Sequence, residues 1–273
     1  MAVFARRPQD PDWMSKVVPS ATELFEVLEK IMSIRLGNTS VEHRRGQYPQ
    51  FTLGTTFGGG QQGPQPFATH DLDDPVIEMI LDSVVLHRLS GNAGRVFQTF
   101  APDLHGHYCS MLHDLHKSKP DLPHPWKASP FSAATLNVGR QTITYRHRDF
   151  QNLAYGWCSL YAFGKFDHKR GGHLILWDLG VIVEIPPGCL ALLPSAVLEH
   201  SNTTIGKDET RHSFTEFTSG HLFRWVDNKC RTDVQMEKDG DARSRSGSQN
   251  WRFGLELFST FEAWCARLSQ VIS

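Results

Sequence analysis

A histidine and an aspartate stand two positions apart in the run Y-R-H-R-D-F, which ends at Phe150. Side chains two positions apart in a strand point to the same side. His147 and Asp149 are therefore expected to present an imidazole and a carboxylate together. His200 follows in L-P-S-A-V-L-E-H-S-N, closing a strand pair that begins with P-P-G. Two imidazoles and one carboxylate leave three positions of an octahedron open, as in non-haem Fe(II) oxygenases. These three residues are the candidate metal ligands and catalytic groups.

An arginine and a serine on the next predicted strand suggest what fills the open positions. A 2-oxoglutarate cosubstrate chelates iron through two oxygens and leaves one position for O₂, but its distal carboxylate needs a cationic partner. Arg211 opens that strand and Ser213 shares its face. A guanidinium donates two parallel hydrogen bonds to a carboxylate. The sequence thus predicts Fe(II) and 2-oxoglutarate as cofactors, with Arg211 and Ser213 binding the latter.

Other interpretations of these residues remain open. The chain has 14 histidines, so an isolated H-x-D arises easily by chance. The histidines could be hydrogen-bonded surface groups, and Arg211 could pair with Glu209 or Glu216. A cupin-type metal protein without a cosubstrate is the nearest competitor. The combined order, spacing and strand placement of the four residues favours the metal site.

The overall composition fits an ordinary globular protein. The chain has 273 residues, of which 40% are hydrophobic, and a net charge of −1. No run of 18 apolar residues or secretory signal appears, so a soluble intracellular protein without membrane contact is expected. The five cysteines are scattered without a C-x-x-C, which argues against a disulfide framework and a thiolate zinc site. Any contact with nucleic acid must come from local basic patches.

The elements that must position the site fall into a helical first part and a β-rich second part. Ser20 and Glu23 form a capping-box pattern that predicts a helix over 20–36. The glycine-rich segment 51–66 is interpreted as a mobile loop. Asp74 and Pro75 open a second helix. The predicted helices after this loop cover 74–91, 92–101 and 103–117.

From Ser132 onward, short β-branched and aromatic runs alternate with turn residues. Eight short strands ending at Val226 are expected to form a double-stranded β-helix, a jelly roll of the cupin kind. The fold class is therefore α+β, with helical support before the core and a helix after it. A single dioxygenase domain is expected over 1–273. Its parts are 1–131, mainly helical; 132–230, the jelly-roll core; 231–252, a flexible loop; and 253–273, a C-terminal helix.

Longer runs of the sequence resemble the fungal branch of the TET/JBP family of 2-oxoglutarate- and Fe(II)-dependent DNA dioxygenases. They are H-R-D-F-Q-N-L-A-Y-G-W, G-K-F-D-H-K-R-G-G-H-L-I-L-W-D-L, P-P-G with L-P-S-A-V-L-E-H-S-N, and R-H-S-F-T-E-F-T-S-G-H-L-F-R-W-V. The similarity covers roughly 50–230. This family oxidises methyl groups on DNA bases, chiefly 5-methylcytosine, and fungal relatives are also associated with N6-methyladenine. The resemblance implies His147, Asp149 and His200 as iron ligands, and Arg211 with Ser213 as cosubstrate residues.

The resemblance also implies residues that bind the substrate. Asn152 matches the H-x-D-x-x-N pattern whose asparagine touches the flipped base, and His221 lies near the position of a base-contacting histidine. Where the family usually has R-Y-S, this chain has His212 in the middle. Because a base in duplex DNA must leave the stack to reach the iron, arginines are expected to hold the phosphates. The candidates are Arg44, Arg45, Arg146 and Arg148.

Three hypotheses on function follow. The first is a monomeric nuclear dioxygenase that acts with O₂ on methylated double-stranded DNA by base flipping. It oxidises 5-methylcytosine to the hydroxymethyl form and further, demethylates N6-methyladenine, or does both. The second is a 2-oxoglutarate-dependent oxygenase of a small metabolite, which has the same iron site. The third is an inactive binding module on the same barrel, which the intact ligand set disfavours.

Overall fold

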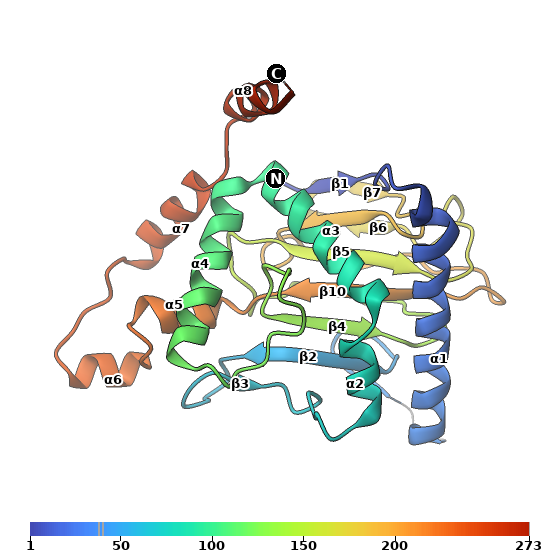
Figure 1. The fold of residues 1–273 in the computed structure, drawn as a ribbon, viewed down its shortest axis with the longest axis horizontal. Helices are drawn as coiled ribbons and strands as arrows, with labels where there is room; N and C mark the ends of the chain where they lie inside the picture. Colours follow the sequence, from blue (N-terminus) through green and yellow to red (C-terminus); the bar gives the residue numbers. More distant parts are fainter. Residues whose placement is uncertain (38, 40, 273) are drawn as a thin grey trace.

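The computed structural model describes residues 1–37, 39 and 41–272, and its centre is a large antiparallel sheet. Seven strands follow the order β1-β8-β5-β10-β4-β2-β3 (Figure 1). Their bounds are β1 Val3–Ala5, β2 Gln50–Thr56, β3 Gln65–Pro66, β4 Ala133–Asn137, β5 Cys158–Phe163, β8 Leu190–Leu193 and β10 His212–Phe217. A second sheet has the order β7-β6-β9, with β6 Leu174–Leu176, β7 Val181–Val183 and β9 His200–Asn202.

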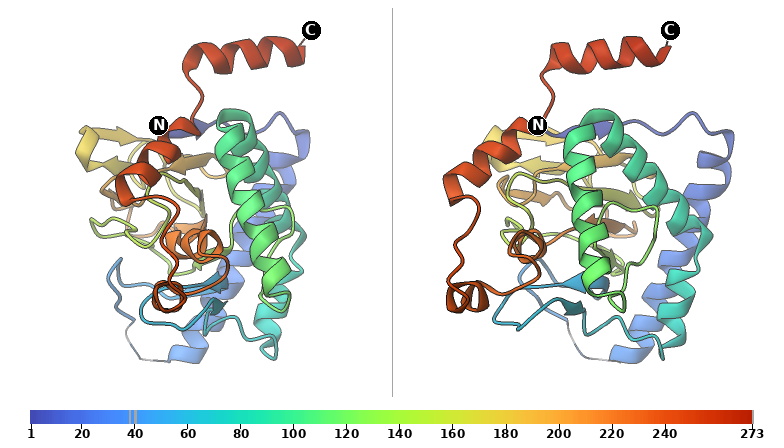
Figure 2. Two further views of the ribbon diagram at one scale, coloured as in Figure 1. Left: turned by 90° about the vertical axis from the view of Figure 1, so that its left-hand side faces the viewer. Right: turned by 60° about the vertical axis from the view of Figure 1, so that its left-hand side comes forward.

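Helices cover one face of the large sheet (Figures 1 and 2). A π-helical turn, η1 (Trp13–Val17), leads into α1, and a 3₁₀ turn, η2 (Trp177–Leu179), joins β6 to β7. The helices are α1 Val18–Leu36, α2 Pro75–Leu81, α3 Val84–Phe100, α4 Pro102–Ser118, α5 Gly220–Asp227, α6 Asp233–Lys238, α7 Gly247–Glu256 and α8 Phe261–Ile272. Among the described residues, none of the helices combines the length and apolar character that a membrane crossing requires.

Strand β10 shows how the sheet separates two environments. Its side chains alternate with period two. Phe214 contacts Trp126 on the helical side, with ring centroids 5.4 Å apart, and belongs to the larger hydrophobic core. Ser213 and Thr215 face a cavity on the other side. A smaller core, which includes Cys158, Ala162, Leu174, Leu176 and Leu193, lies between the two sheets. The α+β class and the antiparallel sheets agree with the sequence prediction.

Several predicted boundaries were wrong. Helix α1 begins at Val18 and has no side-chain cap, because it continues directly from the π-helical turn. The predicted helix over 74–91 is two helices, since Ser83 is extended and interrupts it, and α3 then absorbs most of the separate helix predicted over 92–101. The segment 51–66 is not wholly irregular, because strand β2 takes up its first six residues and β3 its last two.

The C-terminal part also differs from the prediction. The run L-F-R-W-V belongs to helix α5, whose N-cap Ser219 accepts a hydrogen bond from the main-chain N–H of His221. Two capping boxes, Thr232 with Gln235 and Ser246 with Gln249, begin helices α6 and α7 in the segment predicted as a flexible loop. The helix predicted over 253–273 is the end of α7 followed by the separate α8, and Ser273 lies outside the described residues.

Helix α8 stands away from the rest of the molecule (Figure 2). It contacts the body through Trp264, whose ring stacks on Phe100 and whose Nε1–H donates to the carbonyl of Thr99 at 2.9 Å. Arg267 also pairs with Asp103 at 3.0 Å. These contacts reach only the ends of α3 and α4, on the helical side of the sheet.

Candidate metal and cosubstrate site

The irregular segment between β4 and β5 carries two of the three candidate ligands. The sequence prediction that His147 and Asp149 end a β-strand was wrong, because the run T-I-T-Y forms no strand. The main chain is held at isolated points instead. His147 exchanges hydrogen bonds with His200 of β9, 3.0 and 2.9 Å long, and the N–H of Asp149 donates to the carbonyl of Ser195 at 2.9 Å. The main-chain hydrogen bonds to β9 thus hold His147 in place where the sequence had predicted a strand.

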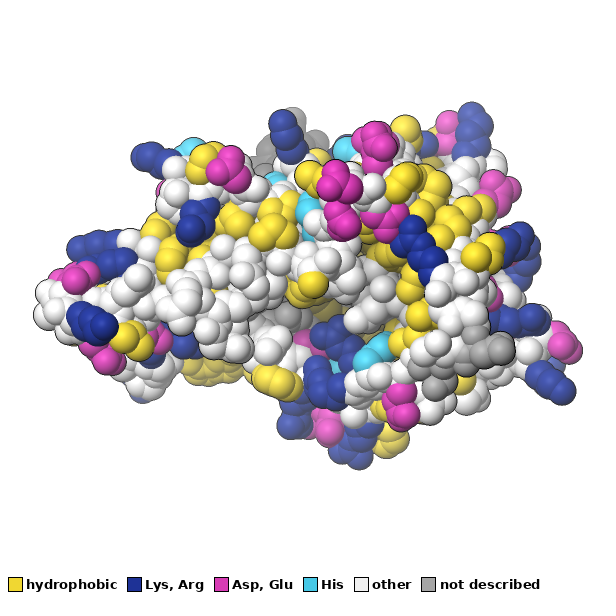
Figure 3. Space-filling model, turned by 90° about the horizontal axis from the view of Figure 1, so that it is seen from below, with side chains coloured by type: hydrophobic (Ala, Val, Ile, Leu, Met, Phe, Trp, Pro, Cys, Tyr) yellow, Lys and Arg dark blue, Asp and Glu magenta, His cyan; other side chains and the backbone are white. Residues whose placement is uncertain are grey.

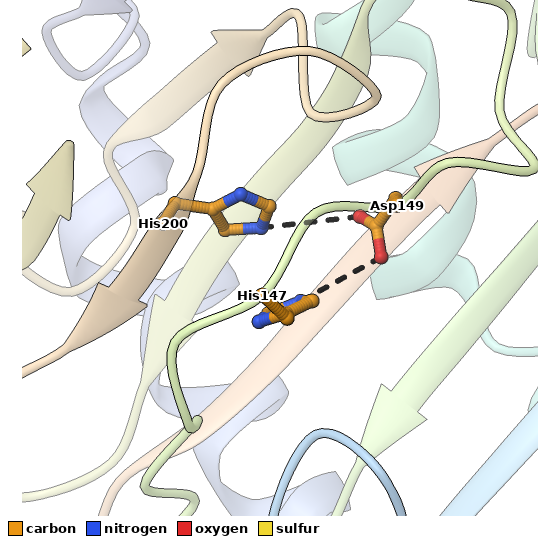
Figure 4. A group of neighbouring side chains, drawn as sticks. All are labelled: His147, Asp149 and His200. Carbon is orange, nitrogen blue, oxygen red and sulfur yellow. Dashed lines mark ion pairs between the residues drawn. The ribbon is translucent and has the colours of Figure 1, made fainter. Parts of the chain in front are cut away.

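His147, Asp149 and His200 come together around one point (Figure 4). Their nearest ligand atoms all lie within 4.8 Å of one another. Nε2 of His147 is 3.6 Å from Oδ1 of Asp149, and Nε2 of His200 is 3.9 Å from Oδ2. These distances leave room for an ion between the three groups. Within the described part of the chain, this is the one cluster of three such side chains with metal-binding geometry.

The two imidazole rings are oriented by main-chain carbonyls. Nδ1 of His147 lies 2.7 Å from the carbonyl of Tyr145, and Nδ1 of His200 lies 2.9 Å from the carbonyl of Leu198. A carbonyl only accepts, so each Nδ1 carries the proton and each Nε2 has its lone pair free. Such partners fix the tautomer of metal-binding histidines. The donor set of two imidazoles and a carboxylate fits Fe(II).

The electrostatics of the cluster favour neutral imidazole and ionised carboxylate. Burial, together with neighbouring His200, lowers the pKa of His147 to about 4. Burial opposes the ionisation of Asp149, but the charge of the Arg45 guanidinium favours it, and the pKa of Asp149 lies below its ordinary value. Both shifts keep the side chains in the protonation states that a metal ion requires.

Arg45 forms the closest ion pair of the site, with Nη2 2.8 Å from Oδ1 of Asp149. Arg44 is more distant, at 4.0 Å from the same oxygen. The sequence placed both arginines among the candidate phosphate ligands, but the structure turns Arg45 toward the carboxylate instead. Sequence reasoning missed this contact. The run H-R-R was visible as a basic patch, but nothing in its spacing shows which residue faces inward.

Arg211 is a buried cation in the same cavity. The residue is 3% exposed, and none of the ion pairs among the described residues involves it. Nη1 donates to the carbonyl and hydroxyl of Thr142 at 3.1 and 3.2 Å, while Nε has no hydrogen-bond partner. Burial lowers its pKa to about 10, so the guanidinium is still charged at neutral pH. A buried charge without a counter-ion is costly, which indicates that the cavity is built for an anion.

The cavity joins the metal ligands to Arg211 and Ser213. The hydroxyl of Ser213 accepts a hydrogen bond from Nδ2 of Asn137 at 2.9 Å, an interaction that the sequence did not predict. Tyr48 and Thr144 line the same space. A carboxylate at Arg211 and a chelating group at the metal position thus share one enclosure, as 2-oxoglutarate requires. The residues present fit both groups.

A second cavity, of about 290 Å³, adjoins the first at Arg45, Asp149 and Phe217. Polar side chains line it, and basic side chains gather beside a hollow on the face seen in Figure 3. Asn152 belongs to this second cavity, and its Nδ2 donates to Oγ of Ser195 at 3.1 Å. Further polar members, which the sequence did not single out, are Gln50, Thr52, Thr55, Thr56 and Thr135.

The other predicted substrate residues lie elsewhere. His221 is in α5 beside Phe57 and lines neighbouring grooves that contain none of the metal ligands. Arg146 pairs with Glu199 at 2.6 Å and its guanidinium covers the ring of Trp177 at 4.6 Å. Arg148 pairs with Asp178 at 2.8 Å. Substrate contact by these three residues stays a prediction.

Comparison with known proteins concerns the fold. No protein-family model matches the chain, and no curated protein matches it. The solved structure of NgTET1 in complex with 5mC DNA has a TM-score of 0.51 and 17% identity, over 72% of this chain and 68% of that one. An oxidoreductase of the 2OG-Fe(II) oxygenase family from Burkholderia pseudomallei has a TM-score of 0.38 and 13% identity, over 80% and 94%. A Pseudomonas putida prolyl-4-hydroxylase has a TM-score of 0.35 and 13% identity, over 72% and 86%. The resemblance to TET/JBP proteins is thus confirmed for the fold: the chain has a TET-like 2-oxoglutarate oxygenase fold.

Proposed function

We propose that the protein is an Fe(II)- and 2-oxoglutarate-dependent dioxygenase that oxidises methyl groups of methylated bases in duplex DNA. One observation carries the enzymatic part of this proposal. The metal-ligand set and the unpaired guanidinium of Arg211 face the same cavity. A site for a cation beside a site for a carboxylate is what this cofactor pair requires.

Each residue has a distinct task in this proposal. His147, Asp149 and His200 hold the iron, and Arg211 with Ser213 holds the distal carboxylate of 2-oxoglutarate. When bound, iron and cosubstrate supply the oxidation of a methyl C–H bond with O₂. The protein binds and orients the reactants and excludes water. Arg45 positions the carboxylate of Asp149.

The polar second cavity supports a base as the substrate. It opens onto Asp149, so a base within it would bring its methyl group to the metal. Asn152 donates to Ser195, which leaves its amide oxygen free to accept a hydrogen bond from an exocyclic amine. NgTET1, whose fold the chain shares, was solved in complex with 5mC DNA. Either 5-methylcytosine or N6-methyladenine offers such an amine beside its methyl group.

The proposal extends to architecture and location. The two facing sheets form the core of a double-stranded β-helix within a single dioxygenase domain over 1–273. The enzyme acts as a monomer, with base flipping from the duplex, and a DNA substrate places it in the nucleus. The first and second sheets share the smaller hydrophobic core, which supports this arrangement.

Oxidation of a small metabolite is the second candidate. The observation that favours it is the neutralisation of Arg146 and Arg148, two predicted phosphate-binding residues, by Glu199 and Asp178. The net charge of −1 also means that the protein as a whole does not attract a polyanion such as DNA.

Product analysis separates the two candidates. The protein is incubated with Fe(II), 2-oxoglutarate and duplexes that carry 5-methylcytosine or N6-methyladenine, which are then digested to nucleosides for mass spectrometry. Oxidised or demethylated nucleosides are expected, and Asp149→Ala should abolish them. Succinate formation without any altered nucleoside would favour the metabolite. A third outcome would indicate a binding module: a double variant with His147→Ala and Asp149→Ala that keeps the biological function of the protein without its metal ligands.

A further inference from the structure

Phe150 is a large apolar side chain exposed to solvent beside the metal-ligand set. It directly follows Asp149 in the chain, yet the residue is 68% exposed, whereas the side chain of Asp149 is 12% exposed. Its neighbours Gln151 and Asn152 line the second cavity. The chain therefore passes from the metal site to the cavity wall through one residue whose aromatic ring is mostly exposed, at a cost in exposed apolar area.

The ring of Phe150 is held by a second segment. The guanidinium of Arg44 lies over it, 5.0 Å from the ring centroid. Arg44 is itself anchored, because its Nη1 donates to the main-chain carbonyl of Arg148 at 3.0 Å. Its Nη2 lies 4.0 Å from Oδ1 of Asp149, and its side chain is 50% exposed. The pair is thus an exposed aromatic ring beside a half-exposed guanidinium that is anchored to the metal-ligand segment.

The glycine-rich segment provides no comparable group. Phe51 is 4% exposed and packs in the larger core. Phe57 packs edge-on against Trp225, with ring centroids 5.3 Å apart. Trp177, whose ring lies under the guanidinium of Arg146, is 42% exposed, but its Nε1–H donates to Ser201. Phe150 is the more exposed ring and has no polar group to satisfy.

A base that leaves the stack leaves a gap in the duplex. Proteins that distort DNA fill such gaps with apolar side chains, and unstacking costs a few kcal/mol. An aromatic ring stacks on the neighbouring bases and offsets part of that cost. A filling residue must lie near the cavity that receives the base without occupying it. Phe150 directly precedes two lining residues of the second cavity but does not line that cavity itself, and its ring lines the neighbouring groove.

From this geometry we infer that Phe150 is the wedge that occupies the gap left by the flipped base, and that Arg44 braces it. This inference rests on the proposed function and assigns the step of base extrusion to a particular side chain. The exposed part of the Arg44 side chain places a positive charge beside the ring, where it attracts a neighbouring phosphate. Phe150 is thus a positioning residue, because it acts on the duplex rather than on the reacting methyl group.

The test compares duplex with single-stranded DNA. Protein with Fe(II) and 2-oxoglutarate is given the same methylated strand alone or in a duplex, and product nucleosides are measured by mass spectrometry. Phe150→Ala should slow turnover of the duplex at least tenfold and of the single strand less than twofold, because a single strand has no paired stack to hold open. Phe150→Leu retains apolar bulk and should lie between wild type and Phe150→Ala.

A matched control and an independent signal complete the test. Phe261→Ala removes a similarly exposed ring, 73% exposed, on helix α8 and should leave both rates unchanged. The fluorescence of 2-aminopurine placed beside the methylated base should rise when wild type binds the duplex and rise less with Phe150→Ala. This measurement does not depend on turnover.

The outcomes distinguish the two proposals. If Phe150→Ala slows both DNAs equally, or neither, the wedge assignment is overturned while DNA oxidation stands. If wild type alters neither the duplex nor the single strand but still forms succinate, the proposed DNA substrate is wrong. The assignment of Phe150 as a wedge is then wrong as well.

Discussion

His147 and His200 face each other across two main-chain hydrogen bonds, 3.0 and 2.9 Å long, so their imidazoles are brought together by backbone pairing. The ring centroids lie 4.3 Å apart. Neither side chain is needed to form this pairing. Metal affinity and folding should therefore respond differently to substitution at either position.

His147→Ala should lose the metal without unfolding. We expect the melting temperature of wild type to rise on addition of Mn(II), used as a redox-stable probe, and that of the variant to stay unchanged. Ligand binding to the folded state alone stabilises it by mass action. Without metal, the two proteins should melt within a few degrees of each other. His113→Ala, an exposed histidine on α4, is the control and should retain the metal response. A full response in His147→Ala would contradict the proposed ligand set.

Arg211→Met should separate stability from cosubstrate binding. Removal of a buried guanidinium without a carboxylate partner relieves an uncompensated charge, so the cofactor-free variant should be as stable as wild type or more so. Affinity for 2-oxoglutarate should fall at least thirtyfold, since the charge-assisted hydrogen bonds to its carboxylate are lost. Denaturant unfolding and calorimetric titration measure the two effects. Arg211→Lys keeps the positive charge but loses the two parallel N–H donors of the guanidinium, so it should bind 2-oxoglutarate with intermediate affinity. Undiminished binding of 2-oxoglutarate in both variants would exclude Arg211 as the partner of its carboxylate.

His212→Phe should weaken the acid sensitivity of the fold. Burial lowers the pKa of His212 to about 4, and its ring stacks on Phe25 with centroids 5.6 Å apart. The unfolded chain then binds more protons than the folded one between pH 6.5 and 4, so wild type loses stability as the pH falls through this window. The phenyl ring keeps the stack and removes the titration. Relative to wild type, the variant should gain on the order of 3 kcal/mol by pH 4. Urea unfolding across this range measures the difference between the variant and wild type, and an equal loss of stability in both on acidification would contradict the prediction.

Glu216→Gln should act in the opposite pH direction. Glu216 is completely buried among the hydroxyls of Ser90, Ser129 and Ser159, at 2.6 to 3.1 Å. Burial raises its pKa, so the folded protein favours the protonated carboxyl. Glu216 therefore stabilises the folded state most below the ordinary pKa of a glutamic acid. This stabilisation declines as the pH rises through the raised pKa of the folded protein. The free energy of unfolding of the variant minus that of wild type should increase from pH 4 to 7. A constant difference would show that Glu216 does not titrate in this range.

The sequence was most informative where chemistry fixes residue types. Two histidines, an aspartate and an arginine were predicted to share a site, and the structure brings all four to one cavity. Helices before an antiparallel β region were also foreseen, because apolar periodicity and turn residues are local properties. These patterns do not depend on knowing the tertiary partners.

The failures occurred where tertiary contacts decide. The run L-F-R-W-V suits a strand by composition, but the Ser219 cap and burial of Leu222, Phe223 and Trp225 make it a helix. The orientation of Arg45 depends on where a distant loop places Asp149. Helices α6 and α7 were within reach of sequence reasoning, since S/T-x-x-Q capping boxes begin both. Their polar composition suggested a loop instead.

The carbonyls that orient the two imidazoles belong to Tyr145 and Leu198, but every amino acid supplies a carbonyl. The path of the backbone therefore aims both rings, whatever side chains occupy those two positions. A substitution of either side chain that keeps the backbone path should leave both rings oriented as they are. The residue types at Tyr145 and Leu198 therefore give no sign of this role, which only the folded backbone reveals.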